Sequence, residues 1–506
     1  MSRKLRADNL GDVITADEMF DVVGLIDLRA NAREWTFGEL HVASNAVARG
    51  LLGRGLVRGD RVAILAENCV EFLLAYLGIM RAGLVAVPVS FRLPAQTIAY
   101  VLKDCEAKAV FVDRERIPLV PEGYARIDID GHGPDSFSAL LQPGSFRSVI
   151  PQPGEIAEIL YTSGSTGMPK GVPLSHDGQL WALARYVSAQ DEGQERTLVV
   201  APLYHMNGLF FSTVALANKW LNVLMPRFDA REYLSRVAEY RCTILSGIPT
   251  MFAMMARERD LLGSLDLSTP KLITIGSAPL TQALIDRVRG IFPKAGIRNS
   301  YGSTEAGPYV FGPHPDGLER PLLSLGYPLP EVEWRLVGGA TPDEGELEMR
   351  TPAMFKSYLN LSAATVEKFR DGWYATGDVI RRDVNGFMYF VGRVDDMFVC
   401  GGENVYPGDI EKMLERHPEV VQAAVVPVPD EIKGHIPVAF IVRAPASQVS
   451  AEELKQFSLR EGPAYSHPRA FIMVDSLPVG GSHKVDKRQL LPQALAAAAH
   501  RSRPPA

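Results

Sequence analysis

Residues 242–276 read CTILSGIPTMFAMMARERDLLGSLDLSTPKLITIG, and this stretch decides the fold class. Two short runs of apolar and β-branched residues, 242–246 and 271–275, predict buried strands. The apolar spacing over 249–262 predicts a helix between them. A strand, a helix and a second strand in this order form a parallel unit in which the helix covers one face of the sheet.

The same alternation continues on both sides of this unit. Residues 281–292 predict a further helix, and 297–301 predict a short strand. Near the N-terminus, 61–66 and 84–89 predict strands and 70–80 predicts the helix that joins them. The first three quarters of the chain are therefore expected to form a large α/β domain of parallel or mixed sheets with helices.

A change of pattern predicts a second, smaller domain. The segment GRVDD at 392–396 is the expected boundary, which divides the chain into residues 1–392 and 393–506. The remainder reads as a small α+β pattern, and about 110 residues suffice for an independent domain. Its expected elements are helices over 409–416 and 451–460 and strands over 420–426 and 437–442. The Ala- and Pro-rich tail, 494–506, is expected to fray.

Composition limits the classes of function. The chain has 506 residues, a formal net charge of −6 and a pI near 6.0, so it offers no basic surface for nucleic acid. Cys69, Cys105, Cys242 and Cys400 form no C-x-x-C pair, which implies neither zinc nor disulfides. The N-terminus lacks the apolar core of a signal peptide, and the most apolar window, 72–89, is too short to span a membrane. These features predict a cytoplasmic protein.

Residues 161–171, YTSGSTGMPKG, combine three glycines, hydroxyl residues and a lysine. Glycines let backbone N–H groups approach a polyanion, hydroxyls donate to its oxygens and lysine adds a positive charge. The stretch predicts a phosphate-binding loop, although its spacing is not that of the P-loop. Two further polar segments, 276–279 and 302–305, follow predicted strands directly, which is where α/β sheets bind ligands.

Seven segments in this order resemble the motifs of the adenylate-forming superfamily, which contains acyl-CoA synthetases, luciferases and peptide-synthetase adenylation domains. The resemblance covers roughly residues 10–492, and its GRVDDM and GGEN segments are close to those of benzoate-type ligases. The segments are YTSGSTGMPKG (161–171), PLYHMNG (202–208), GSAPL (276–280), YGSTEAG (301–307), WYATGD (373–378), GRVDD with GGENVYP (392–407) and GGSHKVDKRQL (480–490). The resemblance implies an acyl-CoA synthetase-like fold whose small C-terminal domain moves.

The resemblance also implies a site for ATP. Asp378 would accept the ribose hydroxyls, with Arg393 near the ribose and α-phosphate. Thr304 would contact the α-phosphate, and Glu305 would bind Mg²⁺, which needs only one or two protein oxygens besides phosphate. Residues that would surround the adenine are Asn299, Tyr301, Gly302, Ser277, Ala278 and Pro279. Residues that would hold the β- and γ-phosphates are Thr162, Ser163, Gly164, Ser165, Thr166, Gly167 and Lys170.

Lys484 is the residue expected to serve the first chemical step. A carboxylate that attacks the α-phosphate brings two anions together, and a flexible ammonium stabilises that arrangement. The family usually has glycine just before this lysine, whereas this chain has His483; Lys487 is a weaker candidate for the same role. Asp395 matches the hinge about which the small domain would turn, to present either Lys484 or the GGEN segment, 401–404.

The acyl and thiol sites follow from the same resemblance. His205 would gate the substrate carboxylate, and an acyl pocket would be lined by His205, Met206, Asn207, Met251, Gly276, Ser300 and Gly302. Polar groups in an apolar slot favour a hydroxylated aromatic or aryl-propenoic acid, although a medium- or long-chain fatty acid fits the same small residues. Coenzyme A would contact Gly401, Gly402, Glu403, Tyr465, His467 and Arg469. Lys433-Gly434-His435 departs from the family, which has a tryptophan and a carboxylate there.

The function predicted is an ATP- and Mg²⁺-dependent carboxylic acid–CoA ligase that forms an acyl-adenylate and then a thioester. The alternative is a stand-alone adenylation enzyme that loads a separate carrier protein, which the departures at the CoA site favour. A nucleotide-binding protein without catalysis and a luciferase-type oxygenase are further options. The expected partners are a small carboxylic acid, with no nucleic acid and no membrane span, and a homodimer is one option for the assembly.

Overall fold

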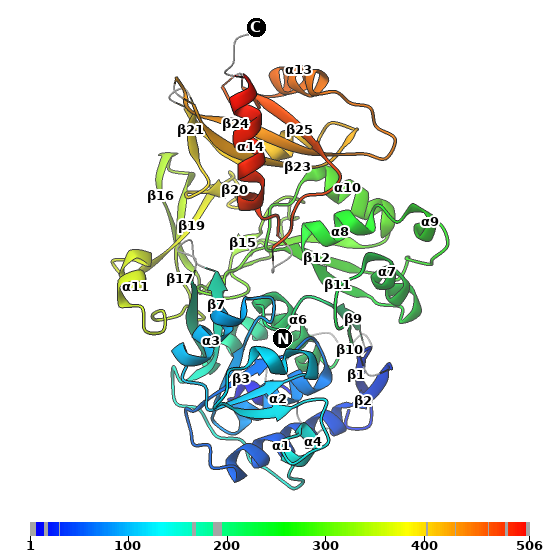
Figure 1. The fold of residues 1–506 in the computed structure, drawn as a ribbon, viewed down its shortest axis with the longest axis vertical. Coiled ribbons are helices and arrows are strands. Elements are labelled where there is room, and N and C mark those ends of the chain that lie inside the picture. The colour runs from blue at the N-terminus through cyan, green and yellow to red at the C-terminus, as the bar shows by residue number, and fades with distance from the viewer. Residues whose placement is uncertain are drawn as a thin grey trace.

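The computed structural model describes residues 7–14, 19–29, 31–163, 168–185, 195–400, 403–430, 432–463, 465–480 and 484–501. Two α/β sheets and an antiparallel sheet form the large N-terminal part, and a separate sheet with three helices forms the C-terminal end, at the top of Figure 1. The predicted α/β class, with a large domain and a small α+β domain, is confirmed. None of the described helices is both long enough and apolar enough to cross a membrane.

A seven-stranded sheet carries the decisive stretch, in the order β13-β12-β11-β9-β10-β1-β2. Its strands are β1 (Val23–Asp27), β2 (Arg33–Thr36), β9 (Arg196–Val199), β10 (Leu221–Leu224), β11 (Ile244–Gly247), β12 (Leu272–Gly276) and β13 (Gly296–Ser300). All neighbours except β1 and β2 are parallel, and Gly276 is in register with Ser300. The helices that pack their apolar side chains on one face are α7 (Ala230–Glu239), α8 (Pro249–Met255) and α10 (Gln282–Ile291). Parallel pairing brings the carboxyl ends of β11, β12 and β13 to one edge.

A six-stranded sheet, β6-β5-β3-β4-β7-β8, contains the two strands on either side of the predicted phosphate-binding loop. Its strands are β3 (Arg61–Leu65), β4 (Val85–Pro88), β5 (Ala109–Val112), β6 (Ala125–Asp128), β7 (Ile156–Ser163) and β8 (Pro169–Ser175). Helices that cover it and the first sheet include α1 (Phe37–Gly53), α2 (Val70–Arg81), α3 (Ala95–Asp104), α4 (Phe137–Leu140), α5 (His176–Ala184) and α6 (Met206–Ala217), and η1 (Leu10–Asp12) and η2 (Arg114–Leu119) are short 3-10 turns. Because β7 and β8 are antiparallel, the residues between Ser163 and Pro169 connect adjacent strands.

Glu158, on β7, is a charged residue inside the largest hydrophobic core. It is 1% exposed and accepts a hydrogen bond from the Tyr76 hydroxyl at 3.1 Å. Burial raises the pKa of this carboxyl to about 7, and the Tyr76 hydrogen bond opposes the shift. The carboxyl is therefore held partly protonated at neutral pH.

A third, antiparallel sheet connects the large domain to the small one. It contains β16 (Glu333–Thr341), β17 (Glu344–Arg350), β18 (Phe369–Arg370), β19 (Trp373–Arg382) and β20 (Met388–Arg393), with β14 (Phe311–Gly312) and β15 (Tyr327–Pro328) pairing nearby and α11 (Ser362–Lys368) beside it. The small domain has β21 (Phe398–Cys400), β22 (Glu403–Val405), β23 (Val420–Asp430), β24 (Gly434–Arg443) and β25 (Ala470–Val474), with α12 (Pro407–Leu414), α13 (Ala451–Glu461) and α14 (Lys487–Arg501). Its core is separate from those of the large domain and begins at Phe398.

Hydrogen bonds fasten the two domains together in this orientation. The Arg287 guanidinium on α10 donates to the carbonyls of Val420 and Val421 on β23, both at 2.7 Å. Glu415 of the small domain is buried here, and burial raises the pKa of its carboxyl to about 7, while the Thr281 hydroxyl at the start of α10 opposes the shift. These contacts hold the small domain against α10.

Two predictions about helices are wrong. The helix expected over 249–262 is divided into α8 and α9 (Arg259–Leu262), and Arg231 on α7 forms ion pairs with Glu258 and Asp260 around the break. The tail expected to fray from Ala494 is helical to Arg501, because Leu490 and Ala494 pack into the core of the small domain. Alanine is also the strongest helix former, so a tail rich in alanine helps this helix to form.

Candidate active site

A cavity of about 1240 Å³ lies where the large domain meets the small one. Most of the residues predicted for the nucleotide, the acyl group and catalysis line it. They are Thr162, Lys170, His205, Met206, Asn207, Met251, Ser277, Ala278, Pro279, Asn299, Ser300, Tyr301, Gly302, Thr304, Glu305, Asp378, Arg393, Asp395 and Lys484. Ser163 is described by its backbone only, and Gly164, Ser165, Thr166, Gly167, Gly401 and Gly402 lie outside the described residues.

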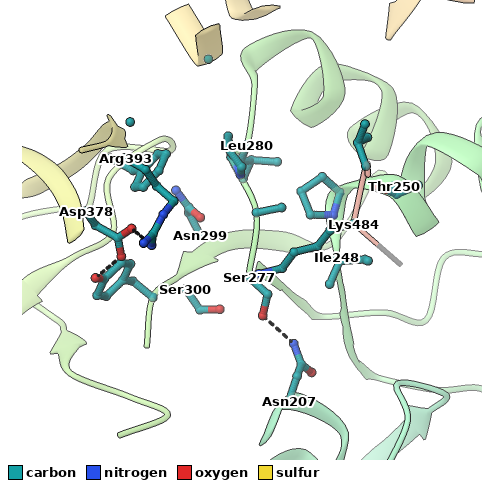
Figure 2. Close-up of a pocket in the computed structure, with 18 of the residues that line it drawn as sticks. Asn207, Ile248, Thr250, Ser277, Leu280, Asn299, Ser300, Asp378, Arg393 and Lys484 are labelled. Atoms are coloured by element: carbon teal, nitrogen blue, oxygen red, sulfur yellow. Dashed lines mark hydrogen bonds and ion pairs between the residues drawn. The ribbon is translucent and has the colours of Figure 1, made fainter. Parts of the chain in front are cut away.

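Asp378 is the centre of a hydrogen-bonded group at one end of the cavity (Figure 2). The Tyr301 hydroxyl donates to Oδ2 at 2.6 Å, and Arg393 Nη1 donates to Oδ1 at 2.8 Å. Burial raises the pKa of Asp378, although Arg393, Tyr301 and Lys484 act against this shift. Arg393 also donates from Nη2 to Asp395 at 3.1 Å, so one guanidinium contacts both the cavity carboxylate and the predicted hinge.

The loops that follow β12 and β13 form the middle of the cavity. Ser277 has φ +64°, a left-handed conformation that is uncommon for a serine and is found at functional sites. Its hydroxyl lies 3.5 Å from the Asn207 amide nitrogen on α6, as Figure 2 shows. Asn299 is 6% exposed and donates to the Leu323 carbonyl at 2.9 Å, so its amide is fixed. The flat ring of a ligand could thus lie between the 277–279 backbone on one side and Tyr301 on the other.

Glu305 lies beside Thr162, at the start of the predicted phosphate-binding loop. Thr162 Oγ1 and the Tyr358 hydroxyl both donate to Glu305 Oε1, at 3.4 Å and 3.1 Å respectively. The described residues contain no cluster of three or more His, Cys, Asp or Glu that could hold a metal by themselves. A single carboxylate with one oxygen already oriented fits Mg²⁺, because this ion takes most of its ligands from phosphates and water.

Lys484 reaches this cavity from the small domain. A short hairpin presents it, in which Gly480 N donates to the Lys484 carbonyl at 2.7 Å and Val479 pairs with Val485. The side chain extends toward Ser277 (Figure 2). Protein from both domains surrounds the ammonium although solvent in the cavity reaches it, and this burial lowers the pKa of Lys484; Asp378 opposes the shift and Arg393 adds to it. Lys487 instead forms an ion pair with Glu411 at 2.7 Å.

The residues predicted for the acyl group line the cavity from the start of α6, from α8 and from the end of β13, with Gly276 as the exception. His205 is the residue before α6 and packs its ring against Tyr204 at 4.8 Å. Gly276 does not line the cavity itself, but a Cβ there would come within 2.2 Å of Ser300 Oγ. The sequence prediction missed apolar residues that also line the cavity, among them Phe210, Phe211, Phe228, Ile248 and Leu280. Phe210 and Phe211 lie on α6, and an apolar run there predicts a buried helix but does not distinguish a pocket from a core.

The described residues predicted to bind coenzyme A lie outside the cavity, on the small domain. Cys400 on β21 pairs with Glu403 on β22, and its Sγ lies 3.2 Å from the Tyr465 carbonyl. Glu403 therefore lies near the 465–469 segment. Arg469 Nη1 lies 2.7 Å from His467 Nδ1. Glu403, Tyr465, His467 and Arg469 thus share one domain, but none of them contacts the nucleotide end in this orientation.

Tyr358 was not predicted as a site residue. It lies in the connection between β17 and α11, lines the cavity and is 5% exposed. Burial and the Glu305 carboxylate raise the pKa of its hydroxyl, which therefore remains a donor at neutral pH. The residues around it, FKSYLN (355–360), carry no motif that distinguishes this tyrosine from a core residue.

Comparison with known proteins agrees with this geometry. The model of the AMP-binding enzyme family matches residues 16–359, and that of the AMP-binding enzyme C-terminal domain matches 409–484. The chain is 30% identical to the fatty acid–[acyl-carrier-protein] ligase ScoC of Streptomyces coeruleorubidus, over 90% of this chain and 91% of that protein. It is 32% identical to feruloyl-CoA synthase of an Amycolatopsis species, over 90% of this chain and 93% of the relative.

A solved structure extends the likeness to the whole fold. The anthranilate CoA ligase AuaEII in complex with anthranoyl-AMP matches with a TM-score of 0.88 and 28% identity, over 97% of this chain and 98% of that one. The family model covers well over half of the sequence, and its C-terminal companion includes Lys484. The chain therefore belongs to the AMP-binding enzyme family, which confirms the predicted adenylate-forming superfamily and its AMP-forming acid–thiol ligase class.

Proposed function

We propose that the protein is an ATP-dependent carboxylic acid–CoA ligase. The observation that carries the proposal is the meeting of Lys484 from the small domain with Asp378 and Glu305 from the large domain in one cavity. A cation brought by one domain to an acidic, loop-lined site of the other suits a reaction in which negative charge builds up between two bound anions. Relatives whose names describe CoA or carrier-protein ligases support the same reaction class.

In the proposed first step, a carboxylate oxygen of the acid attacks the α-phosphorus of ATP, and the bond to pyrophosphate breaks. Asp378 accepts hydrogen bonds from the ribose hydroxyls, while Tyr301 and Arg393 keep its carboxylate in place. Lys484 and Thr304 stabilise the charge on the α-phosphate, and Lys170 with the 162–167 loop holds the departing pyrophosphate. Mg²⁺ bound at Glu305 would neutralise charge on the phosphates.

In the proposed second step, the sulfur of a thiolate attacks the carbonyl carbon of the acyl-adenylate, and the bond from that carbon to AMP breaks. AMP leaves with the bonding electrons, so the products are a thioester and AMP. We assign the domains to residues 1–392 and 393–506, with Asp395 as the hinge whose rotation brings Glu403, Tyr465, His467 and Arg469 to the site. Hinges are a few residues at the ends of elements, as Asp395 is between β20 and β21.

An aromatic acid is the substrate class that we favour. The lining of the cavity includes three phenylalanines, Phe210, Phe211 and Phe228, and the polar side chains of Asn207 and Ser300. Such a mixture suits a flat ring with a hydrogen-bonding substituent better than a long alkyl chain. The names of two relatives, feruloyl-CoA synthase and anthranilate CoA ligase, indicate acids of this kind. The name of the fatty acid–[acyl-carrier-protein] ligase relative supports the fatty-acid alternative.

Coenzyme A is the proposed acceptor, and a separate carrier protein is the second candidate. The 433–435 segment favours the carrier, because Lys433 stands where the family has a tryptophan on which the adenine of CoA could stack. The proposed compartment is the cytoplasm, where the four buried cysteines would stay reduced. Sedimentation analysis would distinguish a monomer from a homodimer.

The experiment that tests the function measures pyrophosphate release with a panel of aromatic and fatty acids, with and without CoA. Wild type is compared with Lys484→Ala and with Lys487→Ala, the matched lysine that pairs with Glu411. We expect continuous turnover only with CoA, a loss of roughly a hundredfold or more in Lys484→Ala, and little change in Lys487→Ala. Release that does not depend on CoA would favour carrier loading, and full activity of Lys484→Ala would refute the assignment of the lysine.

A further inference from the structure

Tyr358 contacts two groups of opposite charge in the cavity. Its hydroxyl donates to Glu305 Oε1 at 3.1 Å, and the Lys170 ammonium lies 5.2 Å from the centre of its ring. We propose that Tyr358 is a positioning residue, which orients the Glu305 carboxylate for a divalent cation and keeps it apart from Lys170. This inference rests on the proposed function, since it concerns the metal–nucleotide site of that reaction.

The first support is the way in which the Glu305 oxygens are used. Tyr358 and Thr162 both donate to Oε1, and no hydrogen bond from another described residue occupies Oε2. A carboxylate with one oxygen held by hydroxyl donors presents the other in a fixed direction. Residues behind a metal ligand orient it in this way and typically change metal affinity 10- to 100-fold when they are replaced.

The second support is the rigidity of the loop that carries Tyr358. Phe355 N donates to the Glu305 carbonyl and Leu359 N donates to the Gly171 carbonyl, both at 2.9 Å. One hydrogen bond fastens the loop to the Glu305 segment, and the other fastens it to β8, which bears Lys170. The Tyr358 ring also packs edge-on against the buried ring of Phe355 at 4.8 Å. The hydroxyl is therefore held by packing as well as by backbone contacts.

The third support is the separation of the two charges. Lys170 forms no ion pair with Glu305 among the described residues, although both line the same cavity. A direct pair would occupy the carboxylate with an ammonium and the ammonium with a carboxylate. Lys170 instead lies over the Tyr358 ring, a weaker contact that a phosphate can displace. Both charges thus remain available to a metal–nucleotide complex.

The test compares Tyr358→Phe with Tyr374→Phe. Tyr374 is a second buried tyrosine of the cavity, whose ring packs on Phe355 at 5.5 Å and whose hydroxyl makes no hydrogen bond to Glu305 in the described part of the chain. Isothermal titration calorimetry measures the affinity for ATP in MgCl₂ and in EDTA. The gain in affinity that Mg²⁺ provides should fall roughly tenfold in Tyr358→Phe. The affinity in EDTA should be unchanged, and Tyr374→Phe should match wild type in both conditions.

Several results would overturn the inference. Tyr358→Phe that keeps the wild-type gain from Mg²⁺, or that loses affinity equally in EDTA, would make Tyr358 a packing residue only. If Tyr358→Phe does not fold, Thr162→Val, which removes the other donor to Oε1, must lower the Mg²⁺-dependent gain for the idea to stand. If wild type turns over acid and ATP but Tyr358→Phe keeps the full gain in ATP affinity from Mg²⁺, this inference alone is wrong. If wild type binds no ATP, the proposed function is wrong.

Discussion

Arg287 offers the sharpest test of the proposed domain rotation. Its guanidinium donates two hydrogen bonds of 2.7 Å to the carbonyls of Val420 and Val421, and so holds the small domain in the orientation that places Lys484 in the cavity. Arg287→Ala removes both bonds without replacing any residue predicted to bind the nucleotide or the acyl group. We expect it to shift the small domain away from the orientation that forms the adenylate.

The size of the shift follows from the two bonds. A hydrogen bond from a charged donor contributes about 1.5–3 kcal/mol, and because Arg287 is half-buried we reduce this to about 1 kcal/mol each. The loss of about 2 kcal/mol corresponds to about a 30-fold change in the ratio of the two orientations. Arg289→Ala is the matched control, since Arg289 is exposed on the same helix and has no ion pair or hydrogen bond among the described residues.

Two half-reactions report the ratio. Acyl-adenylate formation from acid and ATP should slow in Arg287→Ala, while thioester formation from preformed acyl-adenylate should stay constant or quicken. Spin labels at Val384→Cys and Ile432→Cys, both fully or almost fully exposed, would report the interdomain distance, because the four native cysteines are buried. Equal effects of Arg287→Ala on both half-reactions, or the same change in rates in Arg289→Ala, would refute the idea that Arg287 holds the small domain in this orientation.

Three further predictions concern single side chains. Glu158→Gln should become more stable than wild type as pH rises. The pKa of Glu158 is raised from 4.5 to about 7 in the folded protein. The protonated carboxyl therefore contributes its full stability to the wild type below pH 4.5, and this contribution is lost as pH rises through 7. The gain should reach up to about 3 kcal/mol in urea unfolding at pH 8 against pH 4.5, and a difference that does not vary with pH would contradict it. Gly302→Ala should reduce acyl-adenylate formation strongly in a stopped assay, because its Cβ would lie 2.4 Å from the Pro308 carbonyl; activity within twofold of wild type would show that the loop adjusts freely. Tyr301→Phe should raise the KM for ATP roughly tenfold through a less fixed Asp378, and an unchanged KM would show that Arg393 alone suffices.

Much of the fold was predictable from local pattern. The strands over 61–66 and 84–89 and the helix over 70–80 appear as β3, β4 and α2, because continuous apolar runs of these lengths fit buried strands and a fully buried helix. The division of the 249–262 helix was not predictable, since the ion pairs of Arg231 that surround the break join residues far apart in sequence. The tail was misread because composition shows neither Leu490 nor Ala494 meeting a core.

The candidate site shows the same contrast. Motifs indicated residues from three separate sheets and two domains, and the structure brings the described nucleotide and acyl residues, except Gly276, to one cavity. Tyr358 and Arg287 escaped prediction because neither lies in a motif. Their roles arise from contacts with Glu305 and with backbone carbonyls of the small domain, which no spacing in the sequence reveals.

In the proposed mechanism, Arg393 would link nucleotide retention to the timing of product release. Its guanidinium contacts Asp378 through one nitrogen and Asp395 through the other, so a rotation at Asp395 would also displace the guanidinium that holds the carboxylate proposed to bind the ribose. With Asp395 as the hinge, the movement that admits the thiol also loosens the grip on the nucleotide. AMP would then be held firmly while the mixed anhydride exists and released once the thioester has formed, without a separate signal. The contacts of one side chain, Arg393, would thus determine that AMP leaves after the thioester has formed.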